Sequence, residues 1–394
     1  MPAGALEGLI RERPWRLGAQ AFGVMAEAAD REASKGRAVQ DYRTRAGVRL
    51  FGPVDAARAR RRRREGWGYP LDQALGLLGQ RGWTVGVQEA VSLLGCERAF
   101  ETVADVMERF FGWSISAPVV QVLAEAAEER AQEVEASAPA AMEESPETLM
   151  VGTDGCQAPR RDGGHEVKRA TIYSKPSRCR RGRRGKLLAK EQVAGLENAE
   201  GFGRILRGRT EAWRGDRARR EVGRGEGAAW IGNLSERSFP GATEIVDFHH
   251  AVEHLWETGE ALGGHRDPSV ATKGRVRHDR RKLKDGRVDW VLEAIERSRD
   301  RGGSALSDER AKTVGLKLKY FRRKAGRMAY GRFGPRGLPI GTGSVEGACK
   351  HVVQSRFKRP GMRWSEPGLK HMPTRKVARL NRHWELLWPH LNVA

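Results

Sequence analysis

The sequence predicts an α/β protein in which a mainly α-helical N-terminal region precedes a mixed core that carries a long all-α insertion. Three observations predict this class. Apolar residues recur at helical spacing through residues 69–135. Short strand-like runs then end in Asp within residues 149–155 and 242–247. A densely charged stretch of helical pattern follows, over residues 265–332.

The composition points to a polyanionic partner. The chain has 394 residues with 72 Lys and Arg against 50 Asp and Glu, a net charge of +22. Clustered cations bind phosphates, so nucleic acid is favoured over an anionic membrane surface. No apolar run approaches the roughly 18 residues that span a bilayer, and the N-terminus lacks a signal-peptide core. The four cysteines are scattered without CxxC spacing, which excludes a zinc ribbon or disulfide framework and fits reduced thiols.

The N-terminal 66 residues form a basic segment. They are polar and rich in arginine, and they end in the run Arg60 to Arg64. Such a cluster predicts a solvated or nucleic-acid-facing segment rather than a packed element. One strand is expected, from Val48 to Val54.

Residues 67–132 are expected to form a helical DNA-binding region. Ser114, Ile115 and Ser116 precede an apolar-periodic segment, and this pattern predicts the turn of a helix-turn-helix unit. A helical bundle without DNA contact is the alternative. Residues 133–147 are rich in Ala, Glu, Ser and Pro, which predicts a linker between domains.

The period changes after this linker. Residues 149–155 read as a strand ending in Asp154-Gly155, and residues 166–174 alternate like a second strand that pairs with it across a turn. A rigid strand end is a recurrent place for a metal-binding carboxylate, although Asp-Gly is also a common turn. Residues 228–234 read as a helix. Residues 242–247 read as a buried strand, followed by a helix from Phe248 to Trp256.

A second candidate carboxylate lies near the C-terminal end. A Gly-rich turn leads to Ser344, which is a good helix N-cap, and to Glu346 in the first helical turn. The positive end of the helix dipole stabilises a carboxylate there. An ordinary helix start is the alternative. The final helices are expected from Val345 to Phe357 and from Glu366 to Trp388.

Several long segments together resemble one family, the Kra-type insertion-sequence (ISKra) transposases of bacteria. These belong to the DDE transposases, whose catalytic core is RNase H-like. The resemblance runs from about Tyr69 to Trp388. It is carried by YPLDQALGL (69–77), TDG with EVKRATIYS (153–174), VAGLENAEGFGRIL (193–206), EGAAWIGNLSERSFPGATEIVDFHHAVEHLW (226–256), LPIGTGSVEGACK (338–350), RFKRPGMRWSEPG (356–368) and RHWELLW (382–388).

The resemblance implies a domain order. The RNase H-like core would begin at residues 148–262, continue through a helical insertion at 263–335, and end with C-terminal helices at 336–394. It also implies metal-dependent cleavage and strand transfer of DNA. Three carboxylates would hold two Mg²⁺ or Mn²⁺ ions that activate the nucleophile and stabilise the leaving oxygen. The matching residues are Asp154, Glu226 and Glu346.

Glu226 departs from the family pattern, which has Asp in this turn. The glutamate is one methylene longer, and positional errors near 1 Å can cost on the order of 100-fold in rate. The preceding residues, Arg219 to Arg224, also read as a poor buried strand. A decayed transposase that only binds DNA is therefore the alternative function. A nuclease that cuts without strand transfer is a third.

Asp247 and His250 form a D-x-x-H pair that the resemblance places beside the catalytic acids as an auxiliary feature. The two side chains could order the metal site, or they could be a satisfied structural pair. A zinc site formed by His249, His250 and His254 is a further alternative, since 250 and 254 lie one helical turn apart.

The expected partner is double-stranded DNA, both the terminal inverted repeats of a transposon and its target. The resemblance also implies a homodimer or higher oligomer on DNA, in the cytoplasm of a bacterium and associated with the nucleoid. Phosphate contacts position DNA without reading its sequence. The expected contacts are Arg277, Arg280, Arg281, Lys282 and Lys284 in the insertion, and Lys350, Arg356, Lys358, Arg359 and Arg363 near the C-terminus.

Overall fold

The computed structural model has a mixed α/β architecture. It divides into two compact units, Met1–Glu135 with Thr374–Ala394, and Ala136–Pro373. The residues that the structure describes are 3–32, 39–49, 52–63, 66–74, 82–139, 145–174, 178–181, 184–187, 189–226, 228–263, 270–302, 306–341, 349–359 and 361–388.

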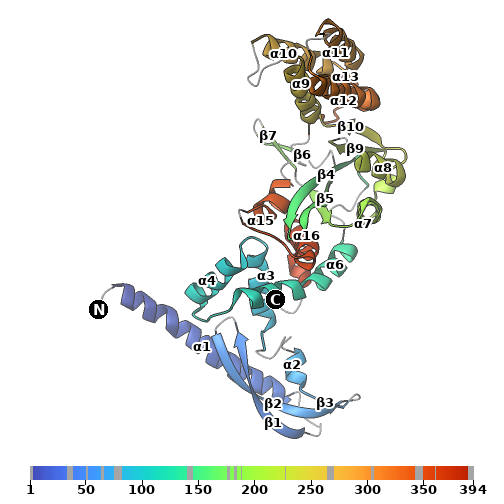
Figure 1. The fold of residues 1–394 in the computed structure, drawn as a ribbon. Coiled ribbons are helices and arrows are strands. Elements are labelled where there is room, and N and C mark those ends of the chain that lie inside the picture. The colour runs from blue at the N-terminus through green and yellow to red at the C-terminus, as the bar shows by residue number, and fades with distance from the viewer. Residues whose placement is uncertain are drawn as a thin grey trace. The chain divides into compact units, whose positions relative to one another are not determined.

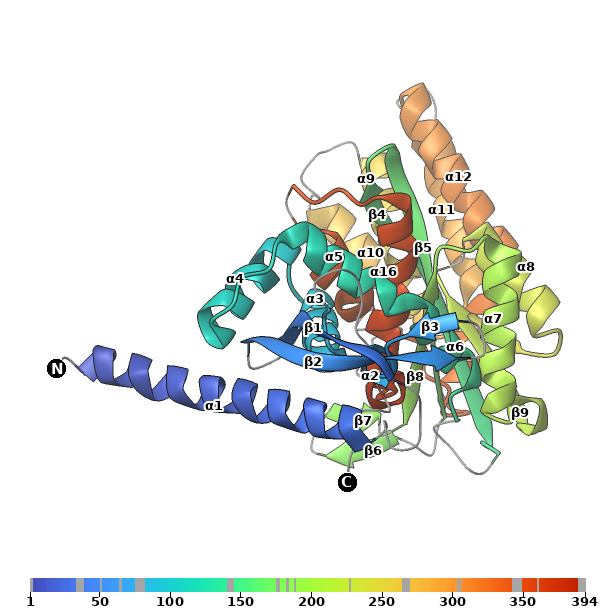
Figure 2. The same ribbon diagram turned by 90° about the horizontal axis from the view of Figure 1, so that it is seen from below.

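The first unit begins with a long helix beside a β-hairpin. Helix α1 (Ala3–Glu32) packs along β2 (Gly52–Arg63), which pairs antiparallel with β1 (Val39–Arg49) and with the short β3 (Gly66–Gly68). Figure 2 shows α1 running alongside the hairpin. The single strand expected at residues 48–54 is therefore wrong, because that stretch holds the end of β1 and the start of β2.

One arginine of the run is packed rather than solvated. Arg61 is 1% exposed and lies 3.7 Å from Asp30 of α1. The carboxylate of Asp30 accepts the N–H of Ala59 at 2.7 Å, and that of Glu27 accepts the N–H of Ala57 at 3.3 Å. Acidic side chains of α1 thus satisfy strand N–H groups that would otherwise lie unpaired. The prediction for residues 60–64 missed these acidic partners, which are about 30 residues away along the chain.

The predicted helical region is confirmed within the described residues. It contains α2 (Pro70–Ala74), α3 (Val85–Gly95), α4 (Phe100–Phe111), α5 (Ala117–Ala126) and α6 (Glu128–Ser137). Residues 114–116 form the expected non-helical turn before α5. Trp83, Val87, Met107, Trp113 and Leu123 belong to its core. Because α6 continues to Ser137, the segment expected as a linker begins inside a helix.

The end of the chain groups with this helical region. Helix α16 (Glu366–Leu380) brings Arg375 within 3.7 Å of Glu128, and both side chains are 1% exposed. After it, α17 (Trp384–Leu387) places the indole N–H of Trp384 2.7 Å from Glu89. The sequence placed residues 336–394 together in the core, whereas these contacts assign 374–394 to the first unit.

The second unit is built on a five-stranded sheet with the order β10-β9-β4-β5-β8 (Figure 1). Three strands pair antiparallel in sequence order: β4 (Thr148–Arg160), β5 (Gly163–Ser174) and β8 (Lys190–Gly195). On the other side of β4, β9 (Arg220–Gly225) and β10 (Thr243–Val246) run parallel to it. The predicted pairing of residues 149–155 with 166–174 is confirmed, but the prediction that the first strand ends at Asp154-Gly155 is wrong, because β4 stays paired with β5 as far as Arg160.

Strand β9 forms in the middle of the sheet although its sequence reads as a poor strand. Its only buried aliphatic side chain is Val222, while Arg224 is 2% exposed and donates to the Tyr173 hydroxyl at 2.6 Å. Gly223 and Gly225 face helix α8 (Ala229–Ser238), where they leave space for the helix to approach. A hydrogen-bonded arginine and two close-packing glycines replace the aliphatic run that the sequence analysis looked for.

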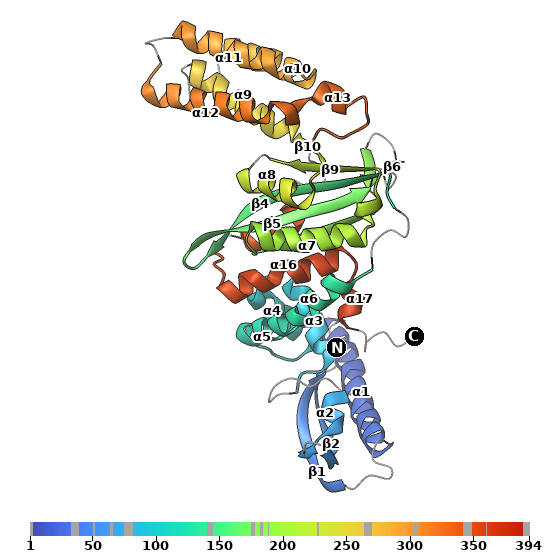
Figure 3. The same cartoon turned by 90° about the vertical axis from the view of Figure 1, so that its right-hand side faces the viewer.

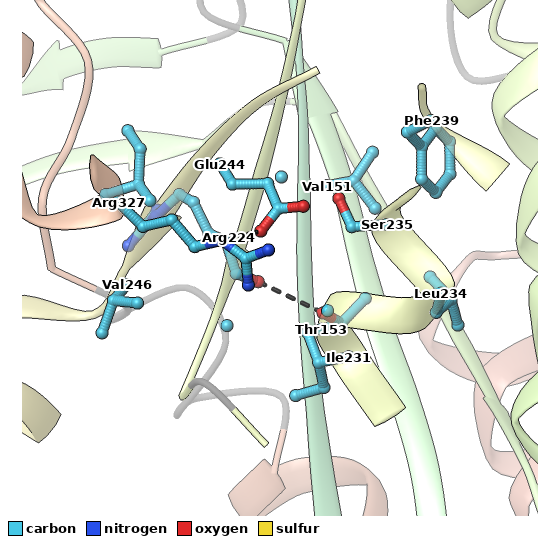
Figure 4. Close-up of a pocket in the computed structure, with 14 residues that line it drawn as sticks. Val151, Thr153, Arg224, Ile231, Leu234, Ser235, Phe239, Glu244, Val246 and Arg327 are labelled. Atoms are coloured by element: carbon cyan, nitrogen blue, oxygen red, sulfur yellow. Dashed lines mark hydrogen bonds and ion pairs between the residues drawn. The ribbon is translucent and has the colours of Figure 1, made fainter. Parts of the chain in front are cut away.

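Beneath α8 these glycines leave a pocket of only about 30 Å³, the volume share of one water. Figure 4 shows its lining, with the Thr153 hydroxyl donating to the Arg224 carbonyl at 3.3 Å. Helix α7 (Ala199–Ala212) packs beside α8 on this face of the sheet (Figure 3). Phe202, Leu206 and Leu234 share a core here with strand residues such as Val151.

A helical subdomain, residues 248–333, follows β10. It contains α9 (Phe248–Gly263), α10 (Val270–Lys284), α11 (Val288–Gly302), α12 (Asp308–Lys324) and α13 (Tyr330–Phe333). The helical prediction for this stretch is confirmed in its described part. Helix α9, which was expected to belong to the core, shares its apolar face with these helices. A π-helical turn, Cys349–Gln354, and α15 (Ser355–Phe357) then precede α16.

Across the described residues, no helix is both long enough and apolar enough to cross a membrane.

Candidate active site

Three carboxylates meet where β9 and β10 end beside the middle of β4. In the register of the sheet, Thr153 pairs with Gly225, and Gly225 pairs with Val246. The next residue of each strand is acidic: Asp154, Glu226 and Asp247. The N–H of Asp247 donates to the Gly225 carbonyl at 3.1 Å, so the register continues to these residues. We call the three carboxylates the acid row.

Asp154, the first predicted ligand, is a buried carboxylate with a resident counter-ion. It is 6% exposed, and the guanidinium of Arg169, which is 1% exposed, donates a hydrogen bond to its Oδ2. Arg169 is the register partner of Asp154 on β5. The antiparallel neighbour strand therefore supplies a positive charge to one end of the acid row.

Glu226, the second predicted ligand, points toward its neighbours and titrates unusually. Burial raises the pKa of its carboxyl to about 7, helped by the charge of Asp154, a hydrogen bond to Asp154 and the charge of Asp247. Arg169 acts in the opposite direction. Burial and the neighbouring negative charges disfavour the ionised form, so the Glu226 carboxyl takes up a proton at a higher pH than a free glutamate does.

Asp247 is a member of the row rather than only an auxiliary residue. It is 2% exposed, and its Oδ1 accepts the backbone N–H of His250 at 2.8 Å, which makes it the N-cap of α9. The D-x-x-H pair is thus joined through the backbone of His250, which fits the structural alternative, while the His250 ring lies 3.3 Å from Glu253. Oδ2 of Asp247 is buried and has no hydrogen-bond partner among the described residues.

Tyr320 of α12, which sequence reasoning missed, lies close enough to the acid row to interact with its charges. The hydroxyl of Tyr320 is buried without a partner in the described part of the chain. Burial raises the pKa of Tyr320, and the charges of Asp247 and Glu226 add to this effect. Its ring lies 4.0 Å from that of His254 and 6.3 Å from that of His250. Tyr320 follows Asp247 by more than 70 residues, so no local spacing could link them.

The histidines of α9 have protein partners. Nδ1 of His254 lies 2.8 Å from the amine of Lys317. Burial, then the charge of Lys317, lowers the pKa of His254 to about 4, so this ring is neutral at physiological pH. His249 instead lies against Gly341 and Phe248. Among the described residues, no three His, Cys, Asp or Glu side chains are arranged to hold a metal ion, which applies to these histidines and to the three carboxylates of the acid row alike.

The donors of the acid row suit a hard cation in chemical type. Carboxylate oxygens are the ligands that Mg²⁺ prefers, and both the unpartnered Oδ2 of Asp247 and the raised pKa of Glu226 indicate uncompensated negative charge. Arg169 already occupies part of Asp154. Glu346, the third predicted ligand, lies outside the described residues, as does Gly227.

Most of the predicted phosphate contacts on α10 are exposed. Arg277, Arg280, Arg281 and Lys284 face solvent. Lys282 is half-buried, with its amine 5.6 Å from the centre of the Trp290 ring. The guanidinium of Arg280 lies 5.9 Å from the centre of the Phe248 ring, the residue after Asp247. The basic end of α10 therefore lies close to one end of the acid row.

The predicted contacts near the C-terminus are divided. Arg356 is 1% exposed and lies 4.6 Å from the Trp364 ring centre, so it is a packed residue and not a surface phosphate contact. Lys358 and Arg363 are exposed, and Arg359 is half-buried, donating to the Ser355 carbonyl at 3.0 Å. The side chain of Lys350 lies outside the described residues.

Comparison with known proteins adds no relative. No protein-family model matches the chain. No curated protein matches it either.

Proposed function

We propose that this protein is a DNA transposase of the DDE type whose acid row lies in an RNase H-like core. The observation that carries the proposal is the register that aligns Asp154, in the middle of β4, with Glu226 and Asp247, which directly follow the neighbouring parallel strands β9 and β10. The sheet order, with three antiparallel strands extended by two parallel ones, supports an RNase H-like core. The basic end of α10 beside Phe248 supports a phosphate backbone as substrate.

Each residue of the row would have a separate task. Asp154 and Glu226 would hold the divalent ions, with Glu346 as the proposed third ligand. Bound Mg²⁺ would supply activation of the attacking oxygen and charge stabilisation of the leaving oxygen. Asp247, fixed as the N-cap of α9, would direct its free Oδ2 toward the row. The exposed arginines of α10 would hold the DNA backbone.

A second function is favoured by one specific observation. The Asp154 carboxylate is already hydrogen-bonded by the buried Arg169, which neutralises a ligand that the metal mechanism needs. Together with the longer side chain at 226, this pair supports a decayed transposase that binds DNA but no longer cuts it. The two functions differ in what Glu226→Asp would do.

The test uses DNA that carries the flanking inverted repeats, with Mg²⁺ or Mn²⁺. The transposase predicts cleavage and joining by the wild type. The decayed protein predicts binding without cleavage, and activity that appears only in Glu226→Asp. Cutting without joining would favour the nuclease. Asp216→Asn is the matched control, because Asp216 is an exposed carboxylate outside the row. Its cleavage should equal that of the wild type.

A further inference from the structure

Helix α12 carries a line of cations that belong neither to the acid row nor to the phosphate contacts proposed on α10. Lys312, Lys319 and Arg323 are all exposed, and no acidic partner is found for them among the described residues. Other cations of this helix do have partners, such as Arg322, which pairs with Glu296. We call the three unpaired residues the α12 stripe.

The stripe points away from the protein core. At 100° per residue, positions 312, 319 and 323 lie within a narrow sector of the helix. The buried residues Val314, Leu318 and Phe321 lie on the opposite side. Leu316, at the remaining position of the sector, is 58% exposed. The stripe is therefore a solvent-facing track, spaced by about 10 Å and then about 6 Å along the helix axis.

Helix α10 carries a comparable line of cations. Lys273, Arg277, Arg280 and Lys284 are exposed at intervals of four, three and four residues; we call them the α10 stripe. Helices α10 and α12 each pack on α9 and on α11, and they do not pack closely on each other. Figure 3 shows α10 with α11 in one layer and α9 with α12 in the other. The two stripes thus occupy opposite corners of the subdomain.

We propose that the α12 stripe is a second binding track for a nucleic-acid backbone, so that the helical subdomain holds two DNA segments at once. The inference rests on the proposed function, which supplies DNA as the partner. The three cations of the α12 stripe lie on one solvent-facing side of the helix, and no acidic partner is found for them among the described residues, so they can neutralise phosphates of a nucleic-acid backbone. The α12 stripe runs from the far end of α9 toward the sheet, since Arg310 donates to the Ala261 carbonyl at one end and the ring of Tyr320 lies near that of His250 at the other. In the α10 stripe, Arg280 lies near Phe248 at the start of α9.

The first test compares the DNA binding of alanine variants on α12. Duplex binding is measured without divalent metal over a range of salt concentrations. A plot of log K against log salt has a negative slope, to which each phosphate contact contributes about 0.9. Replacement of Lys312, Lys319 and Arg323 together by Ala should therefore make this slope shallower by roughly 2 to 3. Lys319→Ala should weaken binding more than Arg322→Ala, because Arg322 is already paired. Unchanged thermal unfolding of these exposed variants confirms that they fold.

A bridging experiment tests the two-track arrangement. The protein is first bound to a duplex on beads, and the capture of a second, fluorescent duplex is then measured. The wild type should capture it, and alanine variants of either stripe should lose capture while still binding one duplex. An unchanged salt slope in the triple α12 variant, or undiminished capture, would overturn the proposal. Neither readout requires cleavage, so failure of the catalytic proposal is seen separately, in the cleavage assay.

Discussion

At the scale of single residues, the acid row explains both what the sequence could show and what it could not. Asp154 and Asp247 were visible because each follows a short apolar run. Glu226 follows a strand rich in Arg and Gly, and only the resemblance pointed to it. Tyr320 and Arg169 were not identified, since their relation to the row depends on neighbouring strands and on a distant helix.

The raised pKa of Glu226 makes stability depend on pH. The folded protein holds this proton up to about pH 7, whereas the unfolded chain releases it near 4.5. The stabilisation is therefore fully present below pH 4.5 and is lost as the pH rises through 7. Allowing for solvent screening at this half-buried group, we expect a loss on the order of 1 kcal/mol.

Denaturant unfolding in EDTA at several pH values measures this effect. Glu226→Gln, which imitates the protonated carboxyl, should remove the pH-dependent part between pH 5 and 8. Equal pH dependence in the wild type and the Gln variant would show that another group is responsible.

Removal of the hydroxyl should have different effects on the unfolding free energy at two tyrosines of the helical subdomain. Tyr330 donates to the Val246 carbonyl at 3.0 Å and is 1% exposed, so Tyr330→Phe should cost about 1–2 kcal/mol of unfolding free energy. The buried Tyr320 hydroxyl has no partner in the described region, so Tyr320→Phe should leave stability unchanged or increase it. Thermal unfolding of the two variants checks this, and a large loss in Tyr320→Phe would reveal a partner for its hydroxyl.

At the scale of elements, β9 is where the sequence prediction fails for a clear physical reason. Strand propensity reflects how well side chains fit a pleated surface. In β9, glycines without side chains let α8 pack closely against the strand, and strand propensity does not measure this contact. Gly225 is the tightest point, because a Cβ there would lie 2.7 Å from Cγ2 of Ile231 and 3.2 Å from the Thr153 carbonyl oxygen. The strands β4 and β5 were predicted, the first from its short apolar run and the second from its alternating sequence.

Gly225→Ala should therefore destabilise the second unit by about 2 kcal/mol through overpacking. Gly241→Ala is the matched control, since a Cβ there would meet no atom within 4 Å. Unfolding free energies of the two variants provide the measurement. Similar values for both would mean that α8 shifts freely and does not fix the position of the strand that precedes Glu226.

At the scale of the whole molecule, the charge of +22 predicts a polyanionic partner but gives no information about the fold. Helical spacing and the change of period predicted the order of helical and mixed regions. Long-range pairs were beyond reach: Glu128 with Arg375, and Asp30 with Arg61, join segments whose local sequences give no sign of each other. The same holds for the opposite placement of the α10 and α12 stripes.

The central claim is that the acid row cleaves DNA with the help of divalent metal. The most direct measurement is the single-turnover rate of first-strand cleavage on inverted-repeat DNA, for the wild type and Asp154→Asn, with Mg²⁺ and with EDTA. The account predicts cleavage only by the wild type with Mg²⁺, and at least a roughly 1,000-fold lower rate in Asp154→Asn, a barrier increase of about 4 kcal/mol. Equal rates for the two proteins, or cleavage that persists in EDTA, would contradict it.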